Sequence, residues 1–254
     1  MQRYFLEVMY KGAQYSGFQV QDNAPTVQAA VEKAFQVLQR QPATLTGSSR
    51  TDTGVNAAQN FFHFDFEVPL HPQFLYKINA ILPRDIVVKN VYRVPPEAHC
   101  RFDAIHRSYR YYIYRHKNPF LEDRAYYFPY TVHLDKMQEA AAVIKEYNDF
   151  TSFSKRNTQV KSFICTVLDS EWQREGEQLV YTIKANRFLR GMVRGITGTM
   201  LQVGRGKLSI DDFRKVVEAK DCSEADFAVP GHGLFLQEVS YPPTLVMEPV
   251  GNEQ

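Results

Sequence analysis

An aspartate in a short polar turn is the side chain of this sequence best suited to chemistry. Asp52 lies in the stretch GSSRTDTGVNAAQNFFHFD, directly before an aromatic run that alternates like a β-strand. Arg50 lies two residues before Asp52, so in an extended backbone both side chains point the same way, and a neighbouring cation favours the ionised carboxylate. We therefore predict a charged carboxylate on a rigid loop, although most aspartates in such turns only cap the backbone.

Basic residues gather in two segments of the chain. Residues 101–117 include five Lys or Arg and one acid, and residues 184–207 include six Lys or Arg and no acid. These segments carry +4 and +6, whereas the whole chain carries only +2, so the remainder has a net charge of −8. Two basic segments in an otherwise acidic chain predict a surface that binds a polyanion.

The first basic segment interleaves aromatic residues with its arginines. In the run RSYRYYIYRHK, the strand period of two places Tyr109 on one face and Arg110 on the other. Because aromatic rings stack on bases and arginines neutralise phosphates, this strand is typical of an RNA-binding surface. A tyrosine-rich core strand is the structural alternative, and we expect one of the two faces to be buried.

The second basic segment, NRFLRGMVRGITGTM, has the period of an amphipathic helix. On that helix Arg187, Arg190 and Arg194 share one face, and apolar residues occupy the other. Three glycines disfavour this helix by roughly 1 kcal/mol each. They also allow another backbone or a substrate to approach closely, and they are Gly191, Gly195 and Gly198.

The surrounding elements mix strands and helices. Strands are expected over residues 3–10, 44–47, 60–68, 85–94, 109–114, 163–172, 178–185 and 233–241, and the tail from residue 242 is expected to be loose. Further helices are expected over residues 26–38, 73–80, 134–146 and 209–219. This order predicts an α+β fold of two similar halves, residues 1–103 and 104–254, that form one catalytic unit. Each half is expected to be a mixed, mainly antiparallel sheet with helices on one face.

Composition restricts the class of protein. The 254 residues are 44% hydrophobic and 23% charged, which is typical of a soluble globular chain. No apolar run reaches the length of about 18 residues that a transmembrane helix needs, and the N-terminus lacks the apolar core of a signal peptide. The three cysteines are far apart and lack metal-binding spacing. We therefore expect a reducing, cytoplasmic location, with no disulfide and no structural zinc.

Five motifs, in order along the chain, resemble those of the TruA-type tRNA pseudouridine synthases. They are RTDTGVNAAQ, RFDAIHRSYRYYIY, NDFTSF, KANRFLRGMVRGITG and GLFLQEVSY. The resemblance implies the pseudouridine synthase fold with a central basic cleft. It also implies an isomerase that converts uridine to pseudouridine in the anticodon stem-loop of tRNA, at positions thirty-eight to forty. Such an enzyme acts as a homodimer and needs no metal or organic cofactor.

The resemblance assigns roles to individual residues. Asp52 matches the family's catalytic aspartate, and Tyr109 matches the active-site tyrosine that packs against the target base. Arg50 matches the arginine that helps to turn the base out, and Arg194 matches the basic partner of the aspartate. The residues expected to bind substrate are Gln19, Tyr109, Arg110, Arg187 and Arg190.

Two residues near the predicted site depart from the family pattern. Phe18 stands where Trp is usual, and Asn56 stands where His is usual after Gly-Val. Both leave Asp52, Tyr109 and Arg194 in place, so they bear on substrate contacts rather than on the reaction.

The reaction of this family needs only one acidic side chain, which Asp52 can supply. Three other functions are the alternatives. Converting uridine to pseudouridine exchanges a C–N for a C–C bond at one sugar carbon without net redox change, so one ionised carboxylate suffices. A non-catalytic RNA-binding protein would have no use for Asp52. A glycoside hydrolase would need a second carboxylate, for which Asp65 is the nearby candidate. A metal site built on His63 and Asp65 would have only two ligands.

Overall fold

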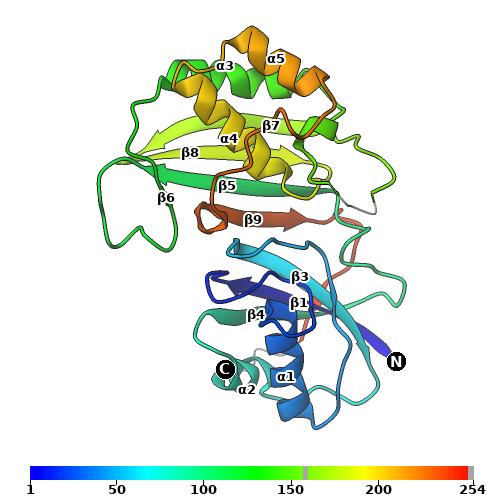
Figure 1. The fold of residues 1–254 in the computed structure, drawn as a ribbon. Coiled ribbons are helices and arrows are strands. Elements are labelled where there is room, and N and C mark those ends of the chain that lie inside the picture. Colours follow the sequence, from blue (N-terminus) through cyan, green and yellow to red (C-terminus); the bar gives the residue numbers. More distant parts are fainter. Residues whose placement is uncertain (157–159, 251–254) are drawn as a thin grey trace. The chain divides into compact units, whose positions relative to one another are not determined.

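The computed structural model describes residues 1–156 and 160–250 of the chain (Figure 1). The chain divides into two compact units, of which the first contains Met1–Ile105 and Leu236–Gln254 and the second contains His106–Phe235. Strand β9 (Leu234–Ser240) carries the chain from the second unit back to the first. The segment after Phe235, which we placed in the C-terminal half, is thus part of the first unit.

The sheet of the first unit is antiparallel. Its strand order is β10-β4-β1-β3, with β10 (Glu248–Pro249), β4 (Ile86–Val94), β1 (Gln2–Tyr10) and β3 (Asn56–Phe66). A short strand, β2 (Thr46–Gly47), pairs with β3. The prediction of a loose tail is wrong at β10, because Glu248 and Pro249 pair with β4. The last four residues of that tail lie outside the described residues.

Two helices cover one face of this sheet (Figure 1). Thr26 caps α1 (Val27–Gln39), because its side chain accepts the N–H of Ala29 at 3.3 Å. The ring of Phe35 on α1 lies 5.1 Å from the rings of both Phe64 and Phe66 on β3. The same ring lies 5.8 Å from Phe74 of α2 (Phe74–Ile81), so one aromatic side chain joins both helices to the sheet.

The second unit repeats the arrangement of a sheet with helices on one face (Figure 1). Strands β5 (His106–Tyr114), β8 (Gln178–Ala185) and β7 (Val167–Glu175) pair antiparallel in that order, and β6 (Tyr126–Tyr127) pairs parallel with β5. The helices are α3 (Leu134–Ile144), α4 (Met192–Gly204) and α5 (Ile210–Glu218). The predicted α+β class, with mainly antiparallel sheets, is therefore confirmed. None of the described helices is long and apolar enough to cross a membrane.

The helix predicted across the second basic segment is wrong at its start. Helix α4 begins at Met192, so Arg187 and Arg190 lie in the loop before it. Gly191 precedes the helix with a φ of 77°, a left-handed conformation that interrupts any helix running through it. Of the three arginines predicted to share a helical face, only Arg194 lies on α4.

Candidate active site

The turn that carries Asp52 connects β2 to β3, and hydrogen bonds fix its backbone on both sides of the aspartate. The carbonyl of Thr51 accepts the N–H of Phe18 at 3.1 Å, and the carbonyl of Asp52 accepts the N–H of Val55 at 3.1 Å. The hydroxyl of Thr51 also lies 2.8 Å from the hydroxyl of Tyr10, on β1. The half-buried Asp52 side chain therefore projects from a fixed point on the sheet, as a reacting carboxylate requires.

The loop of residues 11–18 packs so closely against this turn that it needs glycine at two positions. A Cβ on Gly12 would lie 2.1 Å from the carbonyl oxygen of Val55. Gly17 has a φ of 113°, and its Cβ would lie 3.1 Å from the carbonyl oxygen of Thr51. The N–H of Gly12 donates to Oδ1 of the buried Asn56 at 2.9 Å. Asn56, a departure from the family pattern, therefore anchors the loop beside the Asp52 turn.

Phe18, the other departure, is a packing residue. Its side chain is buried and stacks on Phe62 of β3, with ring centroids 4.6 Å apart and planes 15° apart. A Cβ on Gly47 would lie only 2.2 Å from the Phe18 ring. The ring therefore packs against Gly47 of β2 and Phe62 of β3, two residues that pair with each other.

Arg50 is exposed, and its side chain lines a hollow of about 230 Å³ in the first unit, together with Gln19. The predicted pairing of Arg50 with Asp52 stays a prediction. The other lining residues are Phe18, Gln28, Leu45, Thr46, Gly47, His99, Arg101 and Phe102. Two predicted site residues, Arg50 and Gln19, are thus brought together by the fold.

In the second unit, β5 buries the face that carries Tyr109. Tyr109 is 9% exposed, and Tyr111 and Ile113 on the same face are also buried, so the expected buried face is confirmed. The Tyr109 ring packs edge-on against Phe188, with centroids 4.9 Å apart. On the other face, Arg110 forms an ion pair with Glu175 of β7, which a phosphate would have to displace.

Arg194 holds a neighbouring segment of backbone against α4. Its Nε donates to the carbonyl of Val229 at 2.8 Å, and its Nη2 lies 3.5 Å from the carbonyl of Phe227. The same segment crosses Gly198, where a Cβ would lie 2.1 Å from the carbonyl oxygen of Asp226. The expected close approach of another backbone is therefore confirmed at Gly198, whereas Gly191 and Gly195 meet the side chains of Lys155 and Phe227.

Known proteins resemble this chain along nearly its whole length. A family model described as tRNA pseudouridine synthase matches residues 147–242. The tRNA pseudouridine synthase A of Parabacteroides distasonis is 47% identical over 247 residues, which cover 96% of this chain and 98% of the relative. The protein of that name from Bacteroides fragilis is 46% identical, over 95% of this chain and 97% of the relative. The one from Staphylococcus aureus is 36% identical, over 99% of this chain and 95% of the relative. This chain belongs to the tRNA pseudouridine synthase family.

Membership of the tRNA pseudouridine synthase family confirms the resemblance drawn from the five motifs. The matched range 147–242 contains three of the predicted site residues, Arg187, Arg190 and Arg194. The near-full-length relatives extend the match across the Asp52 turn. The two rivals that rest on Asp65 lose their support, because Asp65 is held by Arg3 through Nε and Nη2, each at 2.7 Å.

The structure also assembles a cluster that the sequence did not predict. The donor atoms of His63, His99 and Cys100 lie within 4.8 Å of one another. A neutral imidazole has one acceptor nitrogen, and in both rings Nδ1 already accepts backbone amides. His63 accepts from Cys100 at 3.4 Å, and His99 accepts from Arg101 and Phe102 at 3.1 and 3.3 Å. Burial also lowers the pKa of His63, to about 4. The cluster is a hydrogen-bonded network that fixes the turn at residues 99–102.

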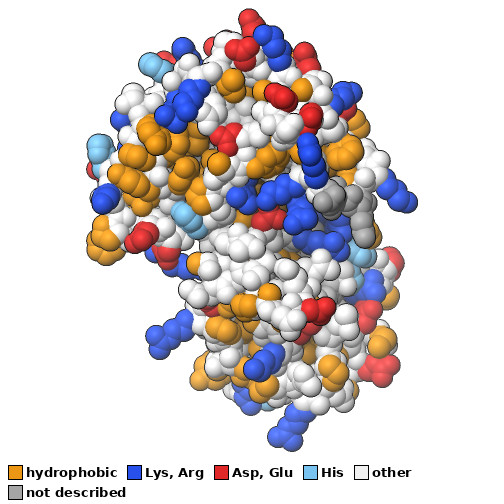
Figure 2. Space-filling view, viewed as in Figure 1, with side chains coloured by type: hydrophobic (Ala, Val, Ile, Leu, Met, Phe, Trp, Pro, Cys, Tyr) orange, Lys and Arg blue, Asp and Glu red, His pale blue; other side chains and the backbone are white. Residues whose placement is uncertain are grey.

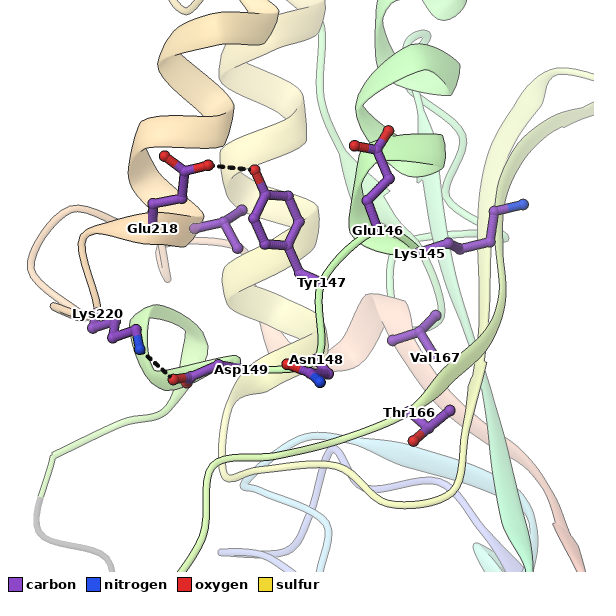
Figure 3. Close-up of a pocket in the computed structure, with 10 residues that line it drawn as sticks. Lys145, Glu146, Tyr147, Asn148, Asp149, Thr166, Val167, Glu218 and Lys220 are labelled. Atoms are coloured by element: carbon purple, nitrogen blue, oxygen red, sulfur yellow. Dashed lines mark hydrogen bonds and ion pairs between the residues drawn. The ribbon is translucent and has the colours of Figure 1, made fainter.

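A larger hollow, of about 580 Å³, lies in the second unit but does not suit a phosphate (Figure 3). Three acids line it, namely Glu146, Asp149 and Glu218. Asp149 pairs with Lys220 at 2.9 Å, and Glu218 accepts the hydroxyl of Tyr147 at 2.7 Å. The three acids of the lining outnumber its two lysines, Lys145 and Lys220, and the described lining contains none of the predicted site residues.

Proposed function

We propose that this chain is a tRNA pseudouridine synthase that isomerises uridine in the anticodon stem-loop, at positions thirty-eight to forty. Asp52 is the reacting carboxylate. The observation that carries the proposal is the fixed Asp52 turn, in a chain whose near-full-length relatives are named tRNA pseudouridine synthase A.

The reaction exchanges one bond at the sugar for another. The bond between C1′ and N1 of uracil breaks, the ring turns, and C5 bonds to C1′; the hydrogen on C5 leaves as a proton, and N1 gains one. Asp52 acts as nucleophile or base on the sugar or the uracil. Because no electron or group enters from outside, the residues of the chain suffice and no cofactor takes part.

The other predicted residues serve the extruded base. A stacked uridine must leave the RNA helix before a carboxylate can reach it, at a cost of a few kcal/mol. Arg50 helps to turn the base out, Tyr109 packs against it, and Arg194 is the cationic partner of Asp52. The rigid packing of Tyr109 on Phe188 and the two carbonyl contacts of Arg194 support these roles, since both side chains are positioned before substrate arrives.

The remaining features follow from the same proposal. Gln19, Arg110, Arg187 and Arg190 bind the RNA around the target uridine. Figure 2 shows Lys and Arg side chains grouped on the viewed face of the protein, beside exposed hydrophobic ones. Both units contribute residues to one reaction, and the enzyme works in the cytoplasm as a homodimer.

Tritium release from tRNA that carries C5-labelled uridine tests the proposal directly. The protein is expected to release label without added metal or cofactor, because C5 loses its hydrogen. Asp52→Ala is expected to release none while its melting temperature and its affinity for tRNA stay near those of the unaltered chain. Arg194→Ala is expected to lower release strongly, because the carboxylate loses its cation.

Asp22→Ala is the matched control, since Asp22 is an exposed aspartate of the same unit. It should release label at the unaltered rate. If the unaltered chain binds tRNA but releases no label, the RNA-binding alternative is correct and the Asp52 turn is structural. Activity that survives Arg194→Ala contradicts the role given to that arginine.

A further inference from the structure

One large aromatic side chain of the first unit is exposed beside the predicted site. Phe102 is 74% exposed, although burying such a ring is ordinarily favourable. One face of the ring rests on His99, with centroids 4.2 Å apart and planes 34° apart. The guanidinium of Arg101 lies 5.7 Å from the ring centroid. The exposed ring is thus supported from behind and flanked by a cation.

The turn that carries Phe102 is rigid. Nδ1 of His99 accepts the amides of Arg101 and Phe102, and the amide of His99 donates to Oδ2 of Asp103 at 2.7 Å. The His99 ring in turn packs on the buried His63, with centroids 4.4 Å apart. Because the turn is fixed in this way, a ligand that stacks on Phe102 loses little free energy to ordering the protein.

The hollow beside Phe102 has the charge that a phosphate requires. Its charged lining residues are Arg50 and Arg101, and its other polar side chains are Gln19, Gln28, Thr46 and His99. No acid lines it among the residues that the structure describes. Arg50 lies two residues from Asp52, a span of at most about 7 Å of extended chain. An occupant that contacts Arg50 is therefore held by the same turn that carries Asp52.

We propose that Phe102 is a stacking platform for an unpaired base of the tRNA next to the target uridine, and that Arg50 and Arg101 hold the phosphate of that nucleotide. The inference rests on the proposed function for the identity of the RNA. Stacking on an aromatic side chain tolerates any base, so the platform positions the RNA without reading its sequence.

Three variants test the platform in the full chain. Phe102→Leu removes the aromatic face, Phe102→Trp keeps it, and Phe120→Leu is the matched control, because Phe120 is 81% exposed in the second unit, outside the hollow. Phe102→Leu is expected to raise both the Kd and the KM for tRNA about 5- to 150-fold, while kcat changes little. Phe102→Trp and Phe120→Leu should keep the unaltered values.

A fluorescent base gives a readout that a purely structural role would not move. Transcripts of tRNA with 2-aminopurine at single unpaired positions of the anticodon loop should show quenching at one position on binding. That quenching should be lost in Phe102→Leu and kept in Phe102→Trp. If Phe102→Leu leaves Kd, KM and every quenching signal unchanged, or if Phe120→Leu has an equal effect, the platform is ruled out.

The two proposals fail in different ways. If the unaltered chain releases tritium and Phe102→Leu changes neither tRNA binding nor the quenching, the platform is wrong and the synthase activity stands. If no variant releases tritium but Phe102→Leu still weakens tRNA binding and abolishes the quenching, the platform stands and the isomerase assignment fails.

Discussion

At the scale of single residues, the buried carboxylate of Glu7 on β1 makes the first unit sensitive to acid. Glu7 is 3% exposed and accepts hydrogen bonds from Gln59 at 2.9 Å and from Asn90 at 2.7 Å, with Nζ of Lys89 at 3.2 Å. Burial by itself raises the pKa of Glu7, but these partners outweigh it and hold the pKa below its ordinary value. The charged form is therefore the one that stabilises the fold.

Glu7→Gln is expected to lower the free energy of unfolding by about 1–3 kcal/mol at neutral pH, because the partners lose a charged acceptor. Since the pKa of Glu7 is lowered by folding, its contribution is present above the ordinary value of 4.5 and disappears as the pH falls through the folded value. The difference between variant and unaltered protein should thus shrink in acid, as urea unfolding at several pH values would show.

The exposed Glu67, at the end of β3, provides the control for this prediction. Glu67→Gln should change the free energy of unfolding by less than about 0.5 kcal/mol at every pH. A Glu7→Gln effect of the same size at neutral and acid pH would mean that only packing is lost, and that the charge of Glu7 contributes nothing.

At the scale of elements, the sequence predicts what depends on local pattern and misses what depends on contacts between distant segments. The helices expected over residues 26–38 and 209–219 follow from local signals, and both are present, the second with a capping box at Ser209. The start of α4 does not, because the helical period continues through Gly191 and hydropathy carries no information on its positive φ.

In the candidate site too, local motifs predict some residues and contacts between distant segments determine the rest. Asp52, Arg50 and Gln19 could be named from motifs, whereas the hollow that holds Arg50 with Phe102 combines segments that are distant in the sequence, from Phe18 to Phe102, and has no local signal. The role of Asn56 also depends on a distant segment, because its Oδ1 accepts the amide of Gly12, 44 residues away. Such contacts are fixed by tertiary packing, which a single sequence does not display.

Gly198 of α4 provides a test at this scale. Glycine to alanine in a helix interior normally stabilises by about 1 kcal/mol. Here the added Cβ would lie 2.1 Å from the carbonyl of Asp226, so Gly198→Ala is expected to destabilise by about 1–3 kcal/mol. It should also lower kcat/KM, because the displaced segment carries the carbonyls that hold Arg194.

Gly176→Ala is the companion variant for Gly198. A Cβ at Gly176 meets nothing within 4 Å, although its φ of 57° is left-handed. This variant should cost only the backbone strain, about 1 kcal/mol, and leave kcat/KM unchanged. Thermal unfolding and tritium release measure both quantities, and a stabilised, fully active Gly198→Ala protein would contradict the proposed contact.

At the scale of the whole molecule, the charge distribution predicts how tRNA binding depends on salt. The two basic segments carry +4 and +6 in a chain whose remainder is negative, so attraction to RNA is concentrated in a few residues. The proposed phosphate contacts are five arginines, namely Arg50, Arg101, Arg110, Arg187 and Arg190. If each neutralises one phosphate, log K against log salt should have a slope of about −4.

Single variants separate specific phosphate contacts from general charge. Arg190→Gln should weaken binding and reduce the magnitude of the slope by about 1, because one fewer counterion is released. Lys33→Gln removes one positive charge from an exposed position on α1 and should leave the slope unchanged. Arg110→Gln should change the slope by less than about 1, since Arg110 must first leave Glu175. Titrations of labelled tRNA at several salt concentrations measure all four slopes.

Two outcomes would contradict this picture of the charge distribution. A slope near zero for the unaltered chain would contradict a basic surface for RNA. Equal changes in Arg190→Gln and Lys33→Gln would show that net charge alone attracts the tRNA.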